Sequence, residues 1–339
     1  MNKIELIKTA QALVANHKGI LAMDESGGTI KKRFDLYNIS QTEESRRLYR
    51  ELILTTPHLG DYISGVILFD ETIRQSKKDG TSFVKVITDA GIIPGIKVDK
   101  GAKAMAGHPD EKVTEGLDGL RGRLTEYAQM GARFAKWRAV ITIGDGIPSK
   151  ACIEANAHAL ARYAALCQEA GIVPMVEPEI LMNGSHSMER CFTVTQEVLR
   201  IVFKQLNKQG VMLEGMILKP NMVLPGLTCS KQQSVDEVAV STVECFLRTV
   251  PAAVPGIMFL SGGQSSELAS ERLNAMNKLF MGKLPWGLSF SYGRAIQEPA
   301  LSIWRGEAGN VTKAQEALLL RSKCNWAARQ GKYSAAMEK

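Results

Sequence analysis

The chain contains, between residues 132 and 180, the apolar run ARFAKWRAV (132–140), the segment KACIEANAHALARYAALCQEAG (150–171) and a second apolar run, IVPMVEPEI (172–180). The middle segment places apolar residues at three-to-four spacing and stops at Gly171, which predicts a helix that ends at this glycine. The runs on either side predict strands that finish in polar or charged residues. A strand, a helix and a strand in this order predict a βαβ unit with parallel strands.

The same pattern recurs along the whole chain. The starts of successive runs are roughly 30–45 residues apart, enough for one strand and one crossover helix. The eight runs are GILAMDES (19–26), ISGVILFDET (63–72), IIPGIKVDK (92–100), ARFAKWRAV (132–140), IVPMVEPEI (172–180), LEGMILKPN (213–221), GIMFLSGGQ (256–264) and GLSFSYGR (287–294).

Eight such units favour a (β/α)8 TIM barrel, because closure of the sheet removes both of its edges. We expect residues 1–339 to form a single barrel domain, with additional helices and a short tail from about residue 296. A doubly wound open sheet is the alternative. It would normally carry a nucleotide-binding fingerprint after the first strand, and none is present there.

Composition bounds the class of protein. The 339 residues are 45% hydrophobic and 23% charged, and the formal net charge is +7. No run of Lys and Arg is longer than residues 31–33, so the charge argues for a small polyanionic substrate and against nucleic acid. No stretch is long and apolar enough for a membrane, the first residues resemble an amphipathic helix, and the cysteines are scattered. These features predict a cytoplasmic protein.

Active sites of barrel enzymes lie at the carboxyl ends of the strands. Chemically useful residues gather at these ends, namely Asp24, Lys97, Asp99, Lys136, Arg138, Glu177, Glu179, Lys219, Ser261 and Arg294. Residues two apart on a strand point the same way, so Lys136 is expected to face the barrel mouth together with Arg138. Because proline is poorly tolerated inside a central strand, the dipeptides Glu177-Pro178 and Lys219-Pro220 predict that both runs end near them.

Lys219 follows an apolar run, residues 216–218. Desolvation and nearby cations both lower the pKa of a lysine, which would supply the free amine that attacks a carbonyl. The plainer interpretation is a lysine that reaches water from a strand end. Asp24 and Glu177 could divide the acid and base work, or could pair with Lys136 or Lys97, and both interpretations can hold together.

Two glycine-rich strand ends, LSGGQS (260–265) and SYGRA (291–295), lie where barrels often bind phosphate with backbone amides. Gly262, Gly263 and Gly293 allow close approach, and Arg294 adds a charged fork. The segment GDGIPSK (144–150) lacks the spacing of a phosphate-cradling P-loop. The five histidines show no paired metal-ligand spacing, so we expect neither a metal nor another cofactor.

These segments resemble class I fructose-1,6-bisphosphate aldolase from near the start of the chain to about Tyr333. The resemblance is carried by GILAMDES, GVILFDET, GIKVDKG, FAKWR, VEPEI, LKPNMV, FLSGGQS and FSYGRA, in the order of that family. It implies a metal-independent lyase of glycolysis and gluconeogenesis. Such an enzyme is usually a homotetramer and cleaves fructose 1,6-bisphosphate reversibly into dihydroxyacetone phosphate and glyceraldehyde 3-phosphate.

The resemblance also implies residue roles. Lys219 would form the Schiff base, Glu177 would be its acid/base, and Asp24 would take the proton of the C4 hydroxyl. Lys136 would hold charge and geometry between them, with Glu179 close by. One phosphate would bind Ser261, Gly262, Gly293 and Arg294, and the other would lie toward Ser26, Thr29, Arg33, Lys97 and Arg138.

Two features depart from the family pattern. Thr29 stands where the family usually has a serine. The chain ends in SAAMEK without a terminal tyrosine, and Tyr333 matches an internal tyrosine of the family and not the one at the end of its tail. Three alternatives stay open: a Schiff-base aldolase for a seven-carbon bisphosphate, a transaldolase-like exchange, and a barrel scaffold that binds actin or another acidic partner.

Overall fold

A closed barrel of parallel strands forms the centre of the computed structural model, which describes residues 2–338. Within these residues the strands follow one another around the barrel in the order β1-β10-β9-β8-β7-β6-β3-β2. Their bounds are β1 Gly19–Ala22, β2 Ile63–Leu68, β3 Ile93–Lys97, β6 Phe134–Ile141, β7 Val173–Ile180, β8 Ile217–Leu218, β9 Gly256–Phe259 and β10 Gly287–Tyr292. Each predicted run contains one of these strands, so the predicted (β/α)8 barrel is confirmed and the open sheet is excluded.

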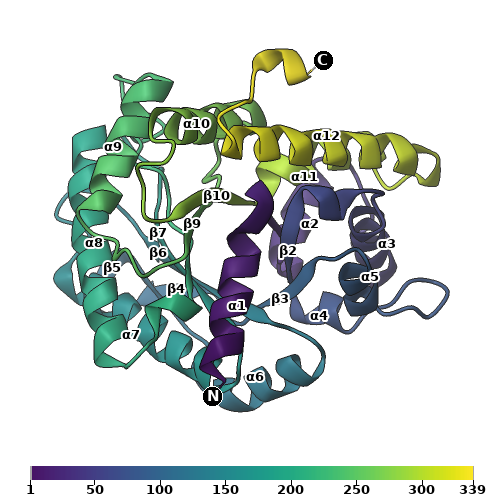
Figure 1. Cartoon of the computed structure of the whole chain (residues 1–339), viewed down its shortest axis with the longest axis horizontal. Coiled ribbons are helices and arrows are strands. Elements are labelled where there is room, and N and C mark those ends of the chain that lie inside the picture. Colours follow the sequence, from purple (N-terminus) through teal and green to yellow (C-terminus); the bar gives the residue numbers. More distant parts are fainter. Residues whose placement is uncertain (1, 339) are drawn as a thin grey trace.

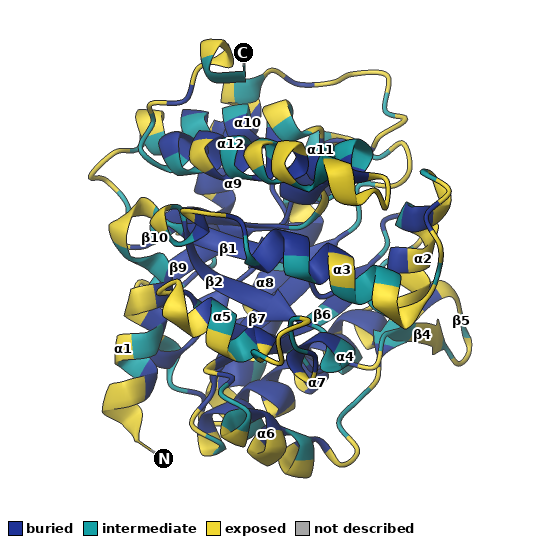
Figure 2. Ribbon diagram, turned by 90° about the vertical axis from the view of Figure 1, so that its right-hand side faces the viewer, coloured by how far each residue is buried: buried dark blue, intermediate teal, exposed yellow. Residues whose placement is uncertain are grey.

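Helices surround the barrel, and they alternate with its strands along the chain (Figure 1). Their bounds are α1 Lys3–Val14, α2 Gly27–Asp35, α3 Glu43–Leu54, α4 Asp70–Ile73, α5 Phe83–Asp89, α6 Leu120–Gln129, α7 Lys150–Glu169, α8 Met188–Lys208, α9 Val235–Leu247, α10 Ser266–Leu279, α11 Arg294–Trp304 and α12 Val311–Arg329. Short 3-10 turns are η1 Ala15–His17, η2 Leu59–Asp61, η3 Leu213–Gly215, η4 Ala308–Asn310 and η5 Ala335–Glu338. Figure 2 shows buried strands inside a ring of helices whose outer faces are exposed.

The amino end of the barrel is closed by α1. Its buried residues Leu6, Ala10 and Leu13 form one apolar cluster with side chains of the barrel interior, including Ile67 and Phe134. Val14, at the end of this helix, lies against the starts of β9 and β10. Because this end is filled, the opposite end is the one at which polar side chains can meet a ligand.

An aromatic ring inside the barrel depends on glycines of the neighbouring strands. A Cβ atom built on Gly95 of β3 would lie 2.3 Å from the Phe134 ring, and one on Gly65 of β2 would lie 3.0 Å from it. The ring therefore occupies space that any other residue at position 95 would take. The packing of β2, β3 and β6 around this ring needs glycine at position 95.

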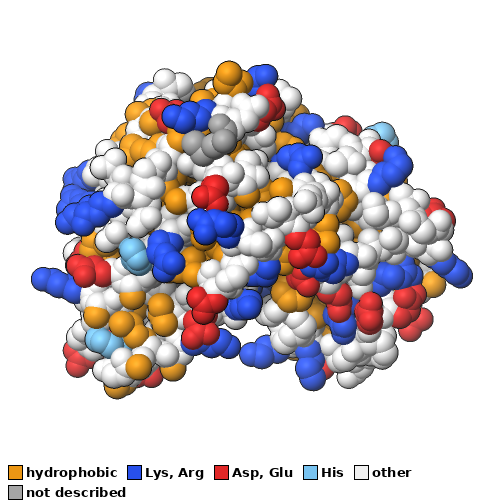
Figure 3. Space-filling model, turned by 90° about the horizontal axis from the view of Figure 1, so that it is seen from below, with side chains coloured by type: hydrophobic (Ala, Val, Ile, Leu, Met, Phe, Trp, Pro, Cys, Tyr) orange, Lys and Arg blue, Asp and Glu red, His pale blue; other side chains and the backbone are white. Residues whose placement is uncertain are grey.

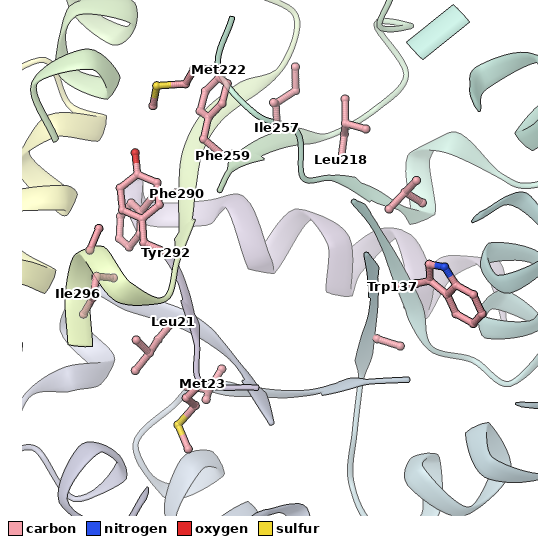
Figure 4. Close-up of a cluster of buried hydrophobic side chains, with 14 of the residues drawn as sticks. Leu21, Met23, Trp137, Leu218, Met222, Ile257, Phe259, Phe290, Tyr292 and Ile296 are labelled. Carbon is pink, nitrogen blue, oxygen red and sulfur yellow. The ribbon is translucent and has the colours of Figure 1, made fainter. Parts of the chain in front are cut away.

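The helices after β10 are packed into the same apolar core as the barrel. Trp304 of α11 stacks on Tyr49 of α3, with ring centroids 5.4 Å apart. Phe290 and Tyr292 lie with their ring centroids 5.6 Å apart, and Figure 4 shows them with Ile296 in a continuous apolar layer. The segment from about residue 296, where we expect additional helices, contains most of α11 and all of α12.

The prediction that the fifth run ends near Glu177-Pro178 is wrong, since β7 continues through Pro178 to Ile180. Val176 O accepts a 2.8 Å bond from Lys219 N, so the even-numbered residues of β7 face β8. The short strand β8 ends at Leu218, which lies opposite Val176, so it does not extend alongside Pro178. The next even-numbered residue of β7, Ile180, donates its N–H to the Asn221 side chain at 2.9 Å. Proline is tolerated because no strand carbonyl stands opposite its missing N–H.

The sequence also failed to indicate a two-stranded antiparallel hairpin outside the barrel. It is formed by β4 (Ala102–Met105) and β5 (His108–Thr114). Its residues are largely polar, including Lys103, Asp110 and Lys112, so no apolar run marks it. The hairpin packs on α7 through Asn156, whose side chain accepts from Thr114 N at 3.2 Å.

Replacing Gly95 with alanine is expected to destabilise the protein by about 1–3 kcal/mol, because the new methyl group overlaps the Phe134 ring. The matched control is Gly122→Ala in α6, where a Cβ meets no atom within 4 Å, and it should stabilise by about 0.5–1 kcal/mol. Urea unfolding of the two variants measures the difference. Equal stability of Gly95→Ala and the wild type would contradict this account of the packing.

Candidate active site

The carboxyl end of the barrel encloses a cavity of about 670 Å³. All fourteen residues that the sequence marked as catalytic or substrate-binding line it. They are Asp24, Ser26, Thr29, Arg33, Lys97, Lys136, Arg138, Glu177, Glu179, Lys219, Ser261, Gly262, Gly293 and Arg294. The strand ends thus gather in one place residues as far apart in the sequence as Asp24 and Arg294.

Three strands project the central charged groups into this cavity. Asp24 follows β1, Lys136 lies on β6, and Glu177 lies on β7. Lys136 Nζ is 2.9 Å from Asp24 Oδ2 and also 2.9 Å from Glu177 Oε2. The lysine cation therefore bridges two carboxylates that come from opposite sides of the mouth.

Lys219 completes the group from the end of β8. Its Nζ lies 3.2 Å from Glu177 Oε1, and the side chains of both residues are only 4% exposed. Glu177 thus stands between two lysines, with one oxygen toward each. The geometry of Lys136 Nζ toward Oε2 is poor for a hydrogen bond, and within residues 2–338 no other donor reaches that oxygen.

The two buried lysines have opposite pKa shifts. Burial by itself would lower the pKa of Lys136, but the charges of Asp24 and Glu177 outweigh it and raise that pKa well above its ordinary value. At Lys219 burial wins: it lowers the pKa, helped by the cation of Lys136 and opposed by Glu177 and Asp24. Lys136 is therefore a fixed cation, and Lys219 is the amine that loses its proton more easily.

Asp24 is held as a carboxylate. Burial alone would raise its pKa, but the cations of Lys136 and Lys219 hold it well below the usual range. Asp24 is thus ionised while both lysines carry charge. The charge on Lys219 is one of the two largest lowering influences, so a change of charge there changes the proton affinity of Asp24.

The glycine-rich segments form a second part of the cavity wall. Gly262 and Gly263 follow β9 and have φ of 58° and 91°, the left-handed region that glycine adopts without strain. A Cβ atom built on Gly263 would lie 3.4 Å from the Arg294 guanidinium, so this arginine stands beside the turn. Successive amides in such a turn, next to a guanidinium, can bind an anion.

A third group of residues lies on the other side of the central lysines. Lys97 Nζ is 2.7 Å from Asp99 Oδ1, and Arg138 pairs with Glu179. Ser26, which precedes α2, has its hydroxyl 3.3 Å from the hydroxyl of Thr29. This wall therefore combines two cations with two hydroxyl groups.

Arg33 occupies a place between the two walls. Its Nη1 is 2.5 Å from Glu25 Oε1, and its Nη2 is 3.7 Å from the Cβ position of Gly293. The resemblance put Arg33 toward the phosphate at Ser26, whereas its guanidinium also borders the glycine-rich wall. One arginine can therefore contact ligand groups on either side.

The sequence did not single out the groups that hold Arg33. Glu25 is buried between Arg33 and Arg50, with Oε2 2.6 Å from Arg50 Nη1, and it also accepts a 2.9 Å bond from Gln297 Nε2. Although burial would raise its pKa, both arginines lower it. The position of Glu25 between Asp24 and Ser26 was the one signal in the sequence that it belongs to the site. Its partners Arg50 and Gln297 lie on α3 and α11, and their spacing in the sequence does not indicate that they contact Glu25.

Charge outside the cavity is mixed. Figure 3 shows Lys and Arg interspersed with Asp and Glu over the face that it presents, without a continuous basic patch. In the described part of the chain, no three residues among the His, Cys, Asp and Glu side chains are arranged to hold a metal ion. Within that same part, no helix has the length and apolar character that crossing a bilayer requires.

Comparison with known proteins gives a consistent result. The family model for class-I fructose-bisphosphate aldolase, of the glycolytic group, matches residues 5–339. A probable fructose-bisphosphate aldolase class 1 of Xanthomonas campestris is 62% identical over 330 residues, which cover 97% of this chain and 98% of the relative. Cytosolic fructose-bisphosphate aldolase 4 of Arabidopsis thaliana is 53% identical over 329 residues, covering 97% of this chain and 84% of the relative.

The fold agrees with a solved structure. Fructose-bisphosphate aldolase from Plasmodium falciparum, determined in complex with TRAP and a small-molecule inhibitor, superposes with a TM-score of 0.96. The two sequences are 51% identical, and the match covers 98% of this chain and 96% of that one. On the family model, the sequence relatives and the shared barrel, this chain belongs to the class I fructose-bisphosphate aldolases.

Proposed function

We propose that Lys219 carries the reaction of this aldehyde-lyase by forming a Schiff base with C2 of fructose 1,6-bisphosphate. The observation that carries the proposal is the contrast between two buried lysines on one carboxylate: Lys136 is held as a cation, while the pKa of Lys219 is lowered. Only an amine without its proton can attack a ketone. Lys219 Nζ adds to C2, and the resulting carbinolamine loses water to give the iminium.

Glu177 is the acid and base of these steps. Its Oε1 lies 3.2 Å from Lys219 Nζ, within reach of the proton that leaves the nitrogen and of the hydroxyl that leaves C2. As acid it gives a proton to the departing hydroxyl, and as base it recovers one when water attacks the iminium during product release. Lys136, fixed on its other oxygen, keeps the carboxylate oriented.

Asp24 takes the proton of the C4 hydroxyl as the C3–C4 bond breaks. The bonding electrons flow into the iminium and give a neutral enamine, while C4 leaves as the aldehyde of glyceraldehyde 3-phosphate. The positive charge at Lys219 is lost in the same step, and that charge is one cause of the low pKa of Asp24. The proton affinity of Asp24 therefore rises when it receives the proton. Protonation of the enamine at C3 and hydrolysis then release dihydroxyacetone phosphate.

The two cavity walls support an assignment of the two phosphates. The C1 phosphate is attached next to the carbon that Lys219 attacks, and the glycine-rich wall adjoins Lys219, since Leu260 N donates to Pro220 O at 3.1 Å. The loop with Ser261 and Gly262, together with Gly293 and Arg294, therefore binds the C1 phosphate. Ser26, Thr29, Lys97 and Arg138 bind the C6 phosphate, and Arg33 lies between the two. Glu179 positions Arg138.

A seven-carbon bisphosphate is the second candidate substrate. A further cavity of about 470 Å³ shares Ser26 and Lys97 with the first, so a longer chain has room beyond the C6 phosphate wall. Comparison of kcat/KM on the two bisphosphates decides, and we expect the six-carbon substrate to be preferred. A higher value for the seven-carbon substrate would reverse the assignment.

We propose a single-domain homotetramer in the cytoplasm with no cofactor. Residues of α11 and α12, such as Leu301 and Leu318, share one apolar cluster with the barrel, which supports a single domain. The resemblance supports the tetramer, and the cytosolic relatives support the location. Sedimentation velocity measures the oligomeric state.

Borohydride reduction in the presence of dihydroxyacetone phosphate is expected to inactivate the protein and to attach the three-carbon unit to Lys219, because borohydride reduces the iminium to a stable amine. Lys219→Ala should lower kcat by roughly a thousandfold or more and should not be labelled. The control, Lys85→Ala, removes an exposed lysine and should behave as the wild type. Mass spectrometry locates the label. Unimpaired turnover by Lys219→Ala would remove the basis of the proposal.

Lys136→Met is expected to move the acid limb of the pH–rate profile to higher pH. The Lys136 cation lowers the pKa of Lys219, so its removal raises that pKa, and a higher pH is needed to free the amine. The pH dependence of borohydride trapping gives the same pKa without full turnover. Lys85→Ala should leave the limb in place. An unchanged or more acidic limb in Lys136→Met would show that this charge does not control Lys219.

A further inference from the structure

Arg272 of α10 is a buried cation with few partners. It is 6% exposed, and its Nη1 donates to Gln264 Oε1 at 2.8 Å. Its Nε has no acceptor, and its guanidinium forms no salt bridge, in the part of the chain that the structure describes. Nothing in the sequence marks Arg272 as functional, because it lies in the middle of a helix and away from every strand end.

A neighbouring arginine shows the ordinary arrangement. Arg321 of α12 is 3% exposed, but it pairs with Glu338 and donates to Ser266 O at 2.7 Å. Both arginines lie near Tyr292, which Figure 4 shows among apolar side chains. Burial raises the pKa of Tyr292, and the charges of Arg321 and Arg272 oppose that rise. Of the two, only Arg321 has a carboxylate partner among residues 2–338. Burial accordingly lowers the pKa of Arg272. A buried charge without a counterion is costly to folding.

Among residues 2–338, the single side chain that Arg272 contacts by a hydrogen bond belongs to the glycine-rich loop. Gln264 lines the active-site cavity, and its Nε2 donates to Ser261 O at 3.0 Å, as does its backbone N–H. Ser261 O and the N–H of Gly262 belong to one planar trans peptide, so they point in opposite directions. Holding the carbonyl toward Gln264 therefore turns the Gly262 N–H the other way. That N–H donates to no other backbone group of residues 2–338.

We propose that Arg272 is a positioning residue for the C1 phosphate: through Gln264 it fixes the amides of loop 261–264, and its charge balances the phosphate that binds in front of that loop. The inference rests on the proposed function, in which this loop holds the phosphate next to the imine. The counterion that Arg272 lacks is then the substrate, which is bound only during turnover. A cation that is costly to the free protein stabilises the complex.

Dihydroxyacetone phosphate and unphosphorylated dihydroxyacetone are suitable probes, because they differ only by the phosphate and both can form an imine. The measurement is the concentration that half-saturates borohydride inactivation. Arg272→Met should raise this concentration about tenfold for dihydroxyacetone phosphate, which corresponds to about 1.4 kcal/mol. For dihydroxyacetone the change should be less than about twofold, since only the phosphate interaction is lost. Arg272→Lys, which keeps the charge, should recover most of the loss.

Thermal stability separates this role from simple packing. Arg272→Met should melt at the same temperature as the free wild type or higher, because it removes an unpaired buried charge of similar volume. The matched control is Arg329→Met at the amino end of the barrel. Arg329 donates to the carbonyls of Lys18 and Val14, far from the glycine-rich loop, so this variant should lose stability without a change in the phosphate-dependent difference. If Arg272→Met does not fold, Arg272→Gln is measured in the same way and must also weaken phosphate binding.

Ser261→Ala distinguishes failure of this inference from failure of the proposed function. If Ser261→Ala weakens dihydroxyacetone phosphate selectively and Arg272→Met does not, the loop binds phosphate and Arg272 has no part in it. If neither variant affects the phosphate-dependent difference, the loop is not the phosphate site, and both proposals fall. Equal losses for the two probes in Arg272→Met, together with a lower melting temperature, would overturn the inference in favour of packing.

Discussion

The bridge that Lys136 makes between Asp24 and Glu177 is the interaction on which the rest of the site depends. Asp24 is buried deeply enough that its carboxylate would be driven to bind a proton, and the Lys136 cation beside it prevents this. The same cation disfavours a second charge close to it, so Lys219, which burial already drives toward the uncharged form, is driven further in that direction. In the proposed mechanism, this one fixed charge makes a base of Asp24 and a nucleophile of Lys219.

The barrel supplies what this bridge requires, namely rigid strand ends that converge from different parts of the chain. Because β8 has only two residues, Lys219 is anchored by one backbone bond, to Val176 of the neighbouring strand. Val176 lies next to Glu177 on that strand, so Lys219, the proposed nucleophile, is held in register with Glu177, its proposed acid/base partner. Closure of the amino end by α1 excludes water from the other side, so the charges meet in a medium where they act strongly.

The sequence predicted the strands well because each one lies in an apolar run that leads into polar or charged residues, a pattern that a closed parallel barrel produces at every strand end. It could not predict the pairings. Glu25 stands between two marked residues, yet its partners Arg50 and Gln297 come from helices whose charges and amides look like ordinary surface positions. The prediction at Pro178 was wrong because it considered β7 alone. Proline is tolerated there because the neighbouring strand β8 is short and the Asn221 side chain accepts the hydrogen bond of Ile180 in place of a strand carbonyl. The β4–β5 hairpin has no apolar face to indicate it.

Buried charge is distributed unequally between the two ends of this barrel. At the amino end Arg329 bonds to backbone carbonyls of Val14 and Lys18, so its charge fastens α1 to the strands. Behind the carboxyl end, Arg321 is matched by Glu338, whereas Arg272 donates to the side-chain amide of Gln264 in the glycine-rich loop and forms no salt bridge among residues 2–338. Folding alone would favour a neutral residue or a carboxylate partner at that position. A carboxylate there would repel a phosphate from behind the loop, and a neutral residue would leave the dianion with fewer cations. An unmatched arginine is therefore what an anion-binding loop requires, at the expense of stability in the free protein.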